Sequence, residues 1–293
     1  MLSIKGSIVA LITPFNADGS VDYVRLKELV DWHIAEGTDG IVALGTTAET
    51  PTLTADECHK IVETVISTAN HRIPVIVGSG SNSTQVMLEK SLAYEQMGAD
   101  GLLVISPYYN KANAEGMYRH FATVADAVHT PLILYNVPSR TSCAIPVPVV
   151  EKLAKHPNVA AIKEASGDLS YATAVARYVG DDFAMYSGND DVVIPILSLG
   201  GSGVISVWAN VVPKVVHQMV ADYFAGDVRA ALDCQLRNYD FIKALFCEVN
   251  PIPVKTAMNL MNNPVGGFRL PLCDMSAPAV ETLRSAMKGV GLL

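Results

Sequence analysis

The chain has 293 residues, 50% of them hydrophobic, and a formal net charge of −8. This length allows a large buried core, and the acidic balance without a cluster of basic residues argues against a nucleic-acid-binding surface. The five cysteines are odd in number and include no C-x-x-C pair, so we expect reduced thiols, with neither a disulfide framework nor a metal site.

The N-terminal segment contains a short apolar run at residues 7–12, which we interpret as a first strand. It lacks the basic start and the small-residue cleavage site of a secretory signal peptide. A second apolar segment, residues 192–213, carries no charge, but Pro195 and three glycines divide it into a helix, a turn and a strand. We therefore expect no membrane-spanning helix.

Short strand-like runs recur along the chain, each followed by a helical pattern, which predicts repeated β–α units. The eight runs are residues 7–12, 40–44, 74–77, 101–105, 131–135, 159–163, 183–186 and 203–207. They predict an α/β fold, a (β/α)8 TIM barrel over residues 1–226. Beyond Asp227 only helical patterns remain, at 228–246, 254–261 and 277–288, so we expect a small C-terminal helical domain over residues 227–293.

Capping residues mark several helix boundaries. Residues 22–36 place apolar side chains on one helical face, and Gly37 stands where a C-terminal cap is expected. Thr54 and Glu57 have the spacing of a capping box, and Asp168 is a candidate N-cap after the sixth strand.

Lys163 ends a run, V-A-A-I-K, that has no alternating polar face. Such a run is typical of a parallel strand covered on both sides, so the lysine is expected at the mouth of the core. Alternation places Val159, Ala161 and Lys163 on one face, and the small Ala161 leaves room for a ligand. Burial of an ammonium group is unfavourable, which favours the neutral amine that attacks carbonyl groups. A solvated surface lysine is the commoner case in proteins.

Polar and turn-forming residues follow most of the other runs. In a (β/α)8 barrel these positions meet at the C-terminal rim, where active sites lie. Each of them also has an ordinary role in turns, but together with a buried lysine they indicate a catalytic site. The segments are T-P at 13–14, G-T-T at 45–47, G-S-G at 78–80, S-P-Y-Y at 106–109, Y-N-V-P-S-R at 135–140 and S-G-N-D at 187–190.

Several longer motifs resemble those of the dihydrodipicolinate synthase family, and the resemblance extends over essentially the whole chain. The family implies a TIM barrel that condenses pyruvate with L-aspartate 4-semialdehyde through a Schiff base, in diaminopimelate and lysine biosynthesis. It also implies a cytoplasmic homo-oligomer, commonly a tetramer built as a dimer of dimers, that needs no cofactor. The motifs are G-T-T-A-E-T-P at 45–51, S-P-Y-Y-N-K at 106–111, Y-N-V-P-S-R-T at 135–141, K-E-A-S-G-D at 163–168, S-G-N-D-D at 187–191, N-P-I-P-V-K-T-A-M-N at 250–259 and R-L-P-L at 269–272.

The resemblance also implies a role for each site residue. Lys163 would form the imine, and Tyr135 would shuttle protons through Thr47 to Tyr109, which reaches in from a neighbouring subunit. The remaining residues would bind the substrates: Thr46 and Thr47 the pyruvate carboxylate, Arg140 the carboxylate of the semialdehyde, and the backbone around Gly188 and Ile205 the rest of the pocket.

Two alternatives share much of this pattern. Class I pyruvate aldolases on the same barrel, such as N-acetylneuraminate lyase and the 2-keto-3-deoxy sugar acid aldolases, have the same lysine and tyrosine. Arg140, however, offers a guanidinium that suits a carboxylate better than a sugar. A catalytically inactive barrel used for binding is the other alternative, and the intact Lys163, Tyr135 and Thr47 argue against it.

The chain departs from the family pattern in two places. Ala48 stands where the family usually has glycine, which reduces the backbone freedom of the loop that carries the paired threonines. Ala55, Cys58 and Val86 stand where lysine-inhibited relatives place polar side chains that hold the inhibitor. We therefore expect weak inhibition by lysine or none.

Overall fold

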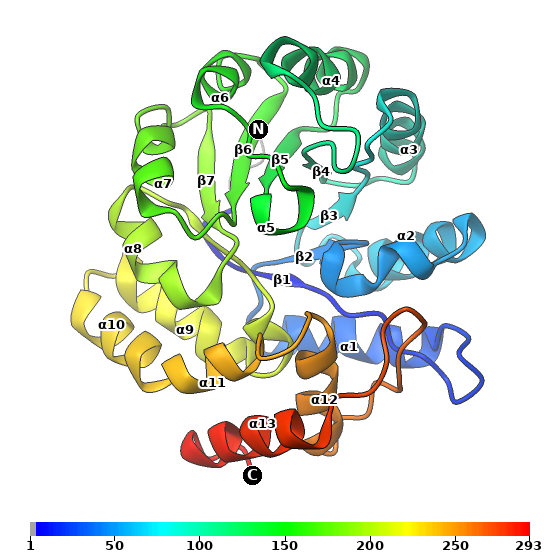
Figure 1. Ribbon diagram of the computed structural model, residues 1–293, viewed down its shortest axis with the longest axis vertical. Helices are drawn as coiled ribbons and strands as arrows, with labels where there is room; N and C mark the ends of the chain where they lie inside the picture. The colour runs from blue at the N-terminus through cyan, green and yellow to red at the C-terminus, as the bar shows by residue number, and fades with distance from the viewer. Residues whose placement is uncertain (1–3) are drawn as a thin grey trace. The chain divides into compact units, whose positions relative to one another are not determined.

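The computed structural model describes residues 4–293, so the first three residues of the N-terminal segment and of the predicted barrel domain lie outside the described residues. Its eight strands follow one another in the order β1 to β8 and form a closed barrel. Helices alternate with these strands and continue after the last of them (Figure 1). The predicted fold class, a (β/α)8 barrel followed by helices, is confirmed.

Each strand lies within two residues of its predicted run. Most strand residues are buried, as expected for a parallel sheet covered on both faces. The strands are β1 (Gly6–Ala10), β2 (Gly40–Ala43), β3 (Val75–Gly78), β4 (Gly101–Ile105), β5 (Leu132–Asn136), β6 (Val159–Glu164), β7 (Ala184–Ser187) and β8 (Gly203–Ser206).

The helices range from the single turn of α5 to the 15 residues of α2, and several begin at a side-chain cap. They are α1 (Tyr23–Ala35), α2 (Ala55–Ala69), α3 (Thr84–Gln96), α4 (Ala114–Ala127), α5 (Pro138–Thr141), α6 (Val147–Leu153), α7 (Leu169–Ala176), α8 (Val193–Ser198), α9 (Pro213–Phe224), α10 (Val228–Arg237), α11 (Tyr239–Ala244), α12 (Ile252–Leu260) and α13 (Ala277–Gly289). Four short 3-10 helices are η1 (Thr46–Ala48), η2 (Thr50–Thr52), η3 (Asp190–Val192) and η4 (Trp208–Asn210).

The predicted helix caps are confirmed. Thr54 and Glu57 form a reciprocal capping box at the start of α2. The carboxylate of Asp168 accepts from two backbone N–H groups at the start of α7. Gly37 directly follows Glu36, the C-cap residue of α1. Its φ of 87° is a left-handed conformation that glycine adopts without strain.

The single helix predicted over residues 228–246 is wrong, because α10 and α11 are separated at Asn238. The Asn238 side-chain amide donates to the backbone carbonyl of Cys234 at 2.9 Å. Local side-chain bonds of this kind compete with continuation of a helix, which explains the break. The predicted boundary between residues 226 and 227 stays a prediction.

The chain forms two compact units, which we describe separately. The first comprises Pro74–Ile205 with the described residues up to Gly6. It holds β3 to β7 and most of β8, and within it α3 packs beside α4 and α4 beside α6 (Figure 1). Strands β5 and β6 pair in parallel, with Tyr135 opposite Lys163 and Asn136 opposite Glu164. This register positions the site described below.

The second unit comprises Ser7–Ile73 and Ser206–Leu293. It joins β1 and β2 to the C-terminal helices, and two sequence-distant segments thus share one core. In this unit α1 packs on α2, α9 on α10, and both α11 and α12 on α13 (Figure 1).

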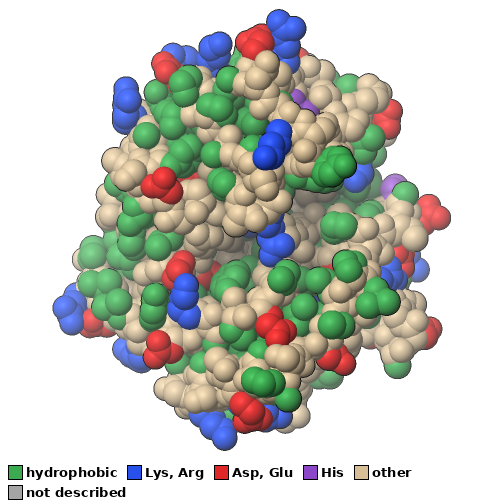
Figure 2. Space-filling model, in the orientation of Figure 1, with side chains coloured by type: hydrophobic (Ala, Val, Ile, Leu, Met, Phe, Trp, Pro, Cys, Tyr) green, Lys and Arg blue, Asp and Glu red, His purple; other side chains and the backbone are tan. Residues whose placement is uncertain are grey.

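Charged side chains of both signs are interspersed on the face shown in Figure 2. Within residues 4–293, none of the helices has the length and apolar character needed to cross a membrane. The interpretation of residues 192–213 as helix, turn and strand is confirmed, since α8 and β8 lie in this segment.

Candidate active site

Lys163 and Tyr135 form the centre of the site in the first unit. They lie opposite each other on β6 and β5, and the Lys163 Nζ atom is 4.4 Å from the centroid of the Tyr135 ring. Both side chains are buried, and Lys163 is only 5% exposed. Among the described residues, no carboxylate lies within ion-pair distance of this amine. The prediction of a buried lysine at the end of the sixth strand is confirmed.

Gly188 lies against Lys163 because it has no side chain. A Cβ atom at position 188 would lie 3.0 Å from Cε of Lys163 and 2.5 Å from Cβ of Ala165. The Gly188 N–H also donates to the carbonyl of Glu164 at 2.6 Å. Any larger residue would therefore clash with Ala165 and crowd the end of the Lys163 side chain, and the structure brings Lys163, Tyr135 and Gly188 together.

Arg140 and Ile205 belong to the same unit. Arg140 lies in α5, the single helical turn that follows β5, and its side chain is exposed. Pro138 begins this turn, as is common at the first helical position. Ile205 is fully buried on β8. The short α5 thus displays a cation four residues beyond the end of the strand that carries Tyr135.

Tyr109 has the most unusual position of the predicted residues. Its side chain is 93% exposed, and its backbone has φ of 67°. A non-glycine residue in this left-handed region is uncommon, and aromatic surface of this extent is rarely left to water. The observation is consistent with a side chain that contacts another molecule.

Thr46 and Thr47 lie in the second unit, in η1, which begins three residues after the last residue of β2. Thr47 is buried, and its hydroxyl oxygen accepts a hydrogen bond from the side-chain amide of Asn250 at 3.1 Å. Thr13 adds a second contact to the same turn, because its hydroxyl donates to the Ala48 carbonyl at 2.7 Å. The relay from Tyr135 through Thr47 to Tyr109 stays a prediction.

The turn tolerates alanine at position 48. Ala48 is not among the described residues with positive φ, whereas its neighbour Glu49 is, with φ of 57°. Both carboxylate oxygens of Glu49 are bonded: Lys255 Nζ lies 2.8 Å from one, and the Arg269 backbone N–H donates to the other at 3.2 Å. The strain in the turn is therefore carried by an anchored glutamate and not by Ala48, and the effect of Ala48 on the geometry of the carboxylate site stays a prediction.

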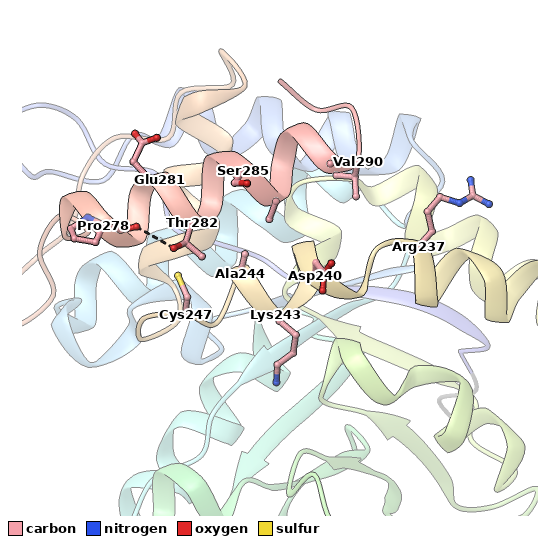
Figure 3. A pocket seen from close by; sticks show the side chains of 12 residues that line it. Arg237, Asp240, Lys243, Ala244, Cys247, Pro278, Glu281, Thr282, Ser285 and Val290 are labelled. Carbon is pink, nitrogen blue, oxygen red and sulfur yellow. Dashed lines mark hydrogen bonds between the residues drawn. The ribbon is translucent and has the colours of Figure 1, made fainter.

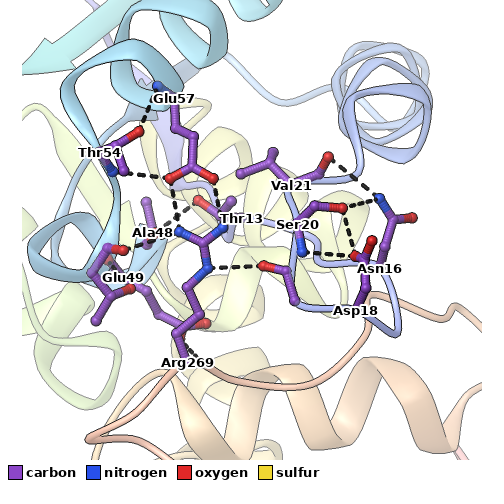
Figure 4. Close-up of polar contacts among 12 residues, drawn as sticks. Thr13, Asn16, Asp18, Ser20, Val21, Ala48, Glu49, Thr54, Glu57 and Arg269 are labelled. Carbon is purple, nitrogen blue, oxygen red and sulfur yellow. Dashed lines mark hydrogen bonds and ion pairs between the residues drawn. The ribbon is translucent and has the colours of Figure 1, made fainter.

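Arg269 anchors the same loop from a second side (Figure 4). Its guanidinium donates to both carboxylate oxygens of Glu57, at 2.6 and 2.8 Å, and to the carbonyls of Thr52 and Gly19. The hydrogen bond from Arg269 lowers the pKa of Glu57 to about 2. The C-terminal segment thus holds the loop of the paired threonines through charged contacts.

A cavity of about 730 Å³ in the second unit lies between α11 and α13 (Figure 3). Arg237, Asp240 and Lys243 line it, but all three are exposed. It lacks the buried functional groups of the site around Lys163, so we do not consider it the active site. Within residues 4–293, no cluster of three or more His, Cys, Asp or Glu side chains is arranged to hold a metal ion.

Sequence reasoning missed several polar residues that support the site. Asn250 and Lys255 lie within a motif quoted for the resemblance, yet neither was assigned a contact, and the partnership of Asn136 with Glu164 was not foreseen. These partners are 28 to 206 residues apart in the chain. A charged residue within a largely apolar strand or helix could have indicated a buried polar contact. Glu164 and Lys255 are examples.

A buried amine beside a tyrosine at the C-terminal end of a barrel strand defines a class of protein, the lysine-dependent barrel enzymes that act on carbonyl compounds. The family model described as "Dihydrodipicolinate synthetase family" matches residues 3–290. A 4-hydroxy-tetrahydrodipicolinate synthase of Thermoanaerobacter sp. (strain X514) is 50% identical over 99% of this chain and 97% of its own length. The enzyme of the same name from Clostridium perfringens (strain SM101 / Type A) is 48% identical over 99% of both chains.

A solved structure gives the same result. The chloride-inhibited dihydrodipicolinate synthase from Acinetobacter baumannii, complexed with pyruvate, has a TM-score of 0.96 and 42% identity, with 99% of this chain and 100% of that chain covered. The chain belongs to the dihydrodipicolinate synthetase family. Its activity is that of the family, the synthesis of 4-hydroxy-tetrahydrodipicolinate in lysine and diaminopimelate biosynthesis. The family consists of lyases that resemble the class I pyruvate-dependent aldolases.

Proposed function

We propose that the chain condenses pyruvate with L-aspartate 4-semialdehyde, and that Lys163 carries the reaction as a Schiff base. The observation that supports this most strongly is the buried Lys163 amine, which faces the Tyr135 ring at the end of β6. The neutral amine attacks the keto carbon of pyruvate, and loss of water leaves an imine. The electron-poor imine acidifies the adjacent methyl group, so removal of one proton gives an enamine.

The second half of the reaction uses the enamine as a nucleophile. Its carbon attacks the aldehyde of the semialdehyde, and the resulting alkoxide takes up a proton. The amino group of the second substrate then attacks the imine carbon, and the ring closes as Lys163 leaves as a free amine. Tyr135 supplies and accepts the protons through Thr47 and Tyr109, because a hydroxyl chain moves protons without a metal or a cofactor.

We assign substrate binding to the residues that the family resemblance indicates. Thr46 and Thr47 bind the pyruvate carboxylate, and the backbone at Gly188 and Ile205 completes the pocket. The guanidinium of Arg140 binds the carboxylate of the semialdehyde, since its planar fork forms paired hydrogen bonds with a carboxylate. The exposure of Arg140 supports this role, because the second substrate must reach the site after pyruvate has bound.

The active form is a homo-oligomer, expected to be a tetramer built as a dimer of dimers. The exposed and strained Tyr109 supports this assembly, since its ring gains partners only from another molecule. The protein is expected in the cytoplasm, where its five free cysteines would stay reduced. Weak inhibition by lysine or none is expected, because exposed Ala55, buried Cys58 and exposed Val86 stand where inhibited relatives have polar groups.

A coupled assay with purified protein tests the proposal. Pyruvate and the semialdehyde together should give a product that a downstream reductase consumes, at a rate abolished in Lys163→Met. Pyruvate with a sugar aldehyde in place of the semialdehyde should give at most a few per cent of that rate. A faster reaction with the sugar aldehyde would instead identify an aldolase of the same class, and activity in Lys163→Met would remove the Schiff base from the mechanism.

A further inference from the structure

A second pair of polar residues directly follows the catalytic pair on the same two strands. Strands β5 and β6 align Tyr135 with Lys163 and, one step further, Asn136 with Glu164. Since side chains alternate along a strand, Asn136 and Glu164 lie on the face opposite to Tyr135 and Lys163. They touch each other there: the Asn136 amide donates to Glu164 Oε2 at 2.7 Å, and both residues are buried.

The orientation of each group in this pair is fixed by the backbone. The Ile145 N–H donates to Asn136 Oδ1 at 2.9 Å, so the amide nitrogen of Asn136 must face Glu164. The Ser166 N–H donates to Glu164 Oε1 at 2.7 Å, and the Ser166 hydroxyl bonds the same oxygen. Only Oε2 of Glu164 therefore remains for Asn136. The Asn136 amide cannot exchange its oxygen and nitrogen without breaking a buried bond, and Glu164 accepts in each of its bonds.

The backbone around Glu164 also connects the pair to the reacting groups. The Ala165 N–H donates to the Asn136 carbonyl at 2.9 Å, and the Gly188 N–H donates to the Glu164 carbonyl at 2.6 Å. Gly188 in turn packs against Lys163, as described above. A shift of Glu164 would thus move the ends of β5 and β6 and the residue that confines the lysine.

Burial raises the pKa of the Glu164 carboxyl, and the bonds from Ser166 and Asn136 oppose this effect. A buried carboxylate costs desolvation, which an apolar residue at this position would avoid. Three donors hold its two oxygens in one orientation, and this arrangement points to a requirement for a fixed bond at this place.

We propose that Asn136 and Glu164 are positioning residues, whose mutual hydrogen bond on the outer face of β5 and β6 holds Lys163 against Tyr135 and Gly188. The inference rests on the proposed function, because it assigns the pair a role in imine formation at Lys163. Positioning errors near 1 Å can slow an enzymatic step by about 10²-fold. The effect is expected on the chemical step more than on pyruvate binding.

Asn136 donates and Glu164 accepts in this bond, so exchanging the donor and the acceptor between the two positions tests the proposal. In Glu164→Gln, the amide oxygen must serve Ser166, so the amide nitrogen faces the nitrogen of Asn136. In Asn136→Asp, one oxygen must serve Ile145, so the other faces Glu164 Oε2. Each single variant therefore places two like groups together, for Asn136→Asp at a pH where both carboxyl groups are ionised. The double variant Asn136→Asp/Glu164→Gln restores one donor and one acceptor, with reversed polarity and unchanged net charge.

Both kcat and the rate of borohydride trapping with pyruvate should fall by about 10- to 100-fold in each single variant, with a smaller change in the KM for pyruvate. The double variant should recover to within about threefold of the wild-type protein. Asn158→Ala is the matched control. Asn158 precedes β6, and its amide donates to three backbone carbonyls, so its loss should lower Tm without slowing the trapping.

The inference is overturned if a folded double variant stays as slow as the single variants, or if the single variants react at the wild-type rate. It is also overturned if each loss of rate only parallels a loss of Tm, as a purely structural role would require. The wild-type control keeps the two claims apart. If wild-type protein is not modified at Lys163, the proposed function fails and the inference fails with it; if wild-type protein is modified and the variants match its rate, only the inference fails.

Discussion

The molecule contains two buried lysines with opposite surroundings. Lys255 is fully buried in the second unit, where its ammonium is paired with Glu49 at 2.8 Å, bonded to the Gly267 carbonyl and flanked by the rings of Phe15 and Phe268. Burial lowers the pKa of Lys255, and the charge of Glu49 opposes this effect. Lys163 lies in the first unit beside an aromatic ring and has no carboxylate partner among the described residues.

This difference shows how burial can be used in two ways. The partners of Lys255 neutralise its charge and accept two of its hydrogen bonds, so the amine is committed to holding the loop of Glu49. Lys163 has the same apolar burial without an anion, so its amine remains available to a carbonyl compound. The chemistry of a buried lysine is therefore decided by its partners more than by its depth.

Exchange of Lys163 for methionine should give the largest effect on activity. Methionine keeps much of the volume but cannot form an imine, so we expect kcat to fall by about 10³-fold or more. The free energy of unfolding should change by no more than about 1 kcal/mol, because no carboxylate loses a partner. Steady-state kinetics and urea unfolding check both values. A large loss of stability would contradict the contrast with Lys255.

The reverse result is expected for Lys255→Met. This change leaves the buried Glu49 carboxylate without its cation, which should cost about 3–5 kcal/mol of folding free energy. Arg229→Met is a suitable control, since the exposed pair of Arg229 with Asp233 should be worth about 1 kcal/mol or less. Urea unfolding of the three proteins measures the difference. Equal stability of Lys255→Met and the control would show that the pair does not hold the loop.

The fold was predictable from sequence to a large extent, because buried parallel strands leave a local pattern. The bounds of β4 agree with its predicted run, and Lys163 was identified from the uncharged run that precedes it. The interruption at Asn238 was not foreseen, since a single side-chain bond to a carbonyl leaves the helical periodicity unchanged. The contacts of Glu49 and of Asn136 were also missed, because their partners lie far away in the chain.

Arg140→Ala extends the comparison to an exposed cation. We propose that the Arg140 guanidinium binds the carboxylate of the semialdehyde and not that of pyruvate. We expect kcat/KM for the semialdehyde to fall by a factor that corresponds to about 2–3 kcal/mol. Borohydride trapping with pyruvate alone should proceed at the wild-type rate. An equal loss in both measurements would contradict this division of roles.

His33 provides a third way to bury a basic group, which is to keep it neutral. Burial lowers the pKa of His33 to about 3, so the folded protein holds it uncharged at pH 5, whereas the unfolded chain takes up a proton below about 6.5. Stability should therefore fall as the pH decreases from 7 to 5, by about 2 kcal/mol from this residue.

Urea unfolding of wild-type protein and His33→Leu at pH 7 and pH 5 isolates this contribution. The variant should lose about 2 kcal/mol less between the two pH values, whatever its stability at pH 7. Glu57 should not obscure the result. Its pKa is about 2 in the folded protein and about 4.5 in the unfolded chain, so its contribution to stability is lost only as the pH falls from about 4.5 to about 2. An identical pH dependence in both proteins would show that His33 titrates normally.

The most direct test of the account compares the two buried lysines in one experiment. Wild-type protein is incubated with pyruvate and borohydride, and the peptides that contain Lys163 and Lys255 are examined by mass spectrometry. The account predicts a reduced pyruvate adduct on Lys163, an unmodified Lys255, and loss of activity in proportion to the adduct. Modification of Lys255, or inactivation while the Lys163 peptide stays unmodified, would contradict it.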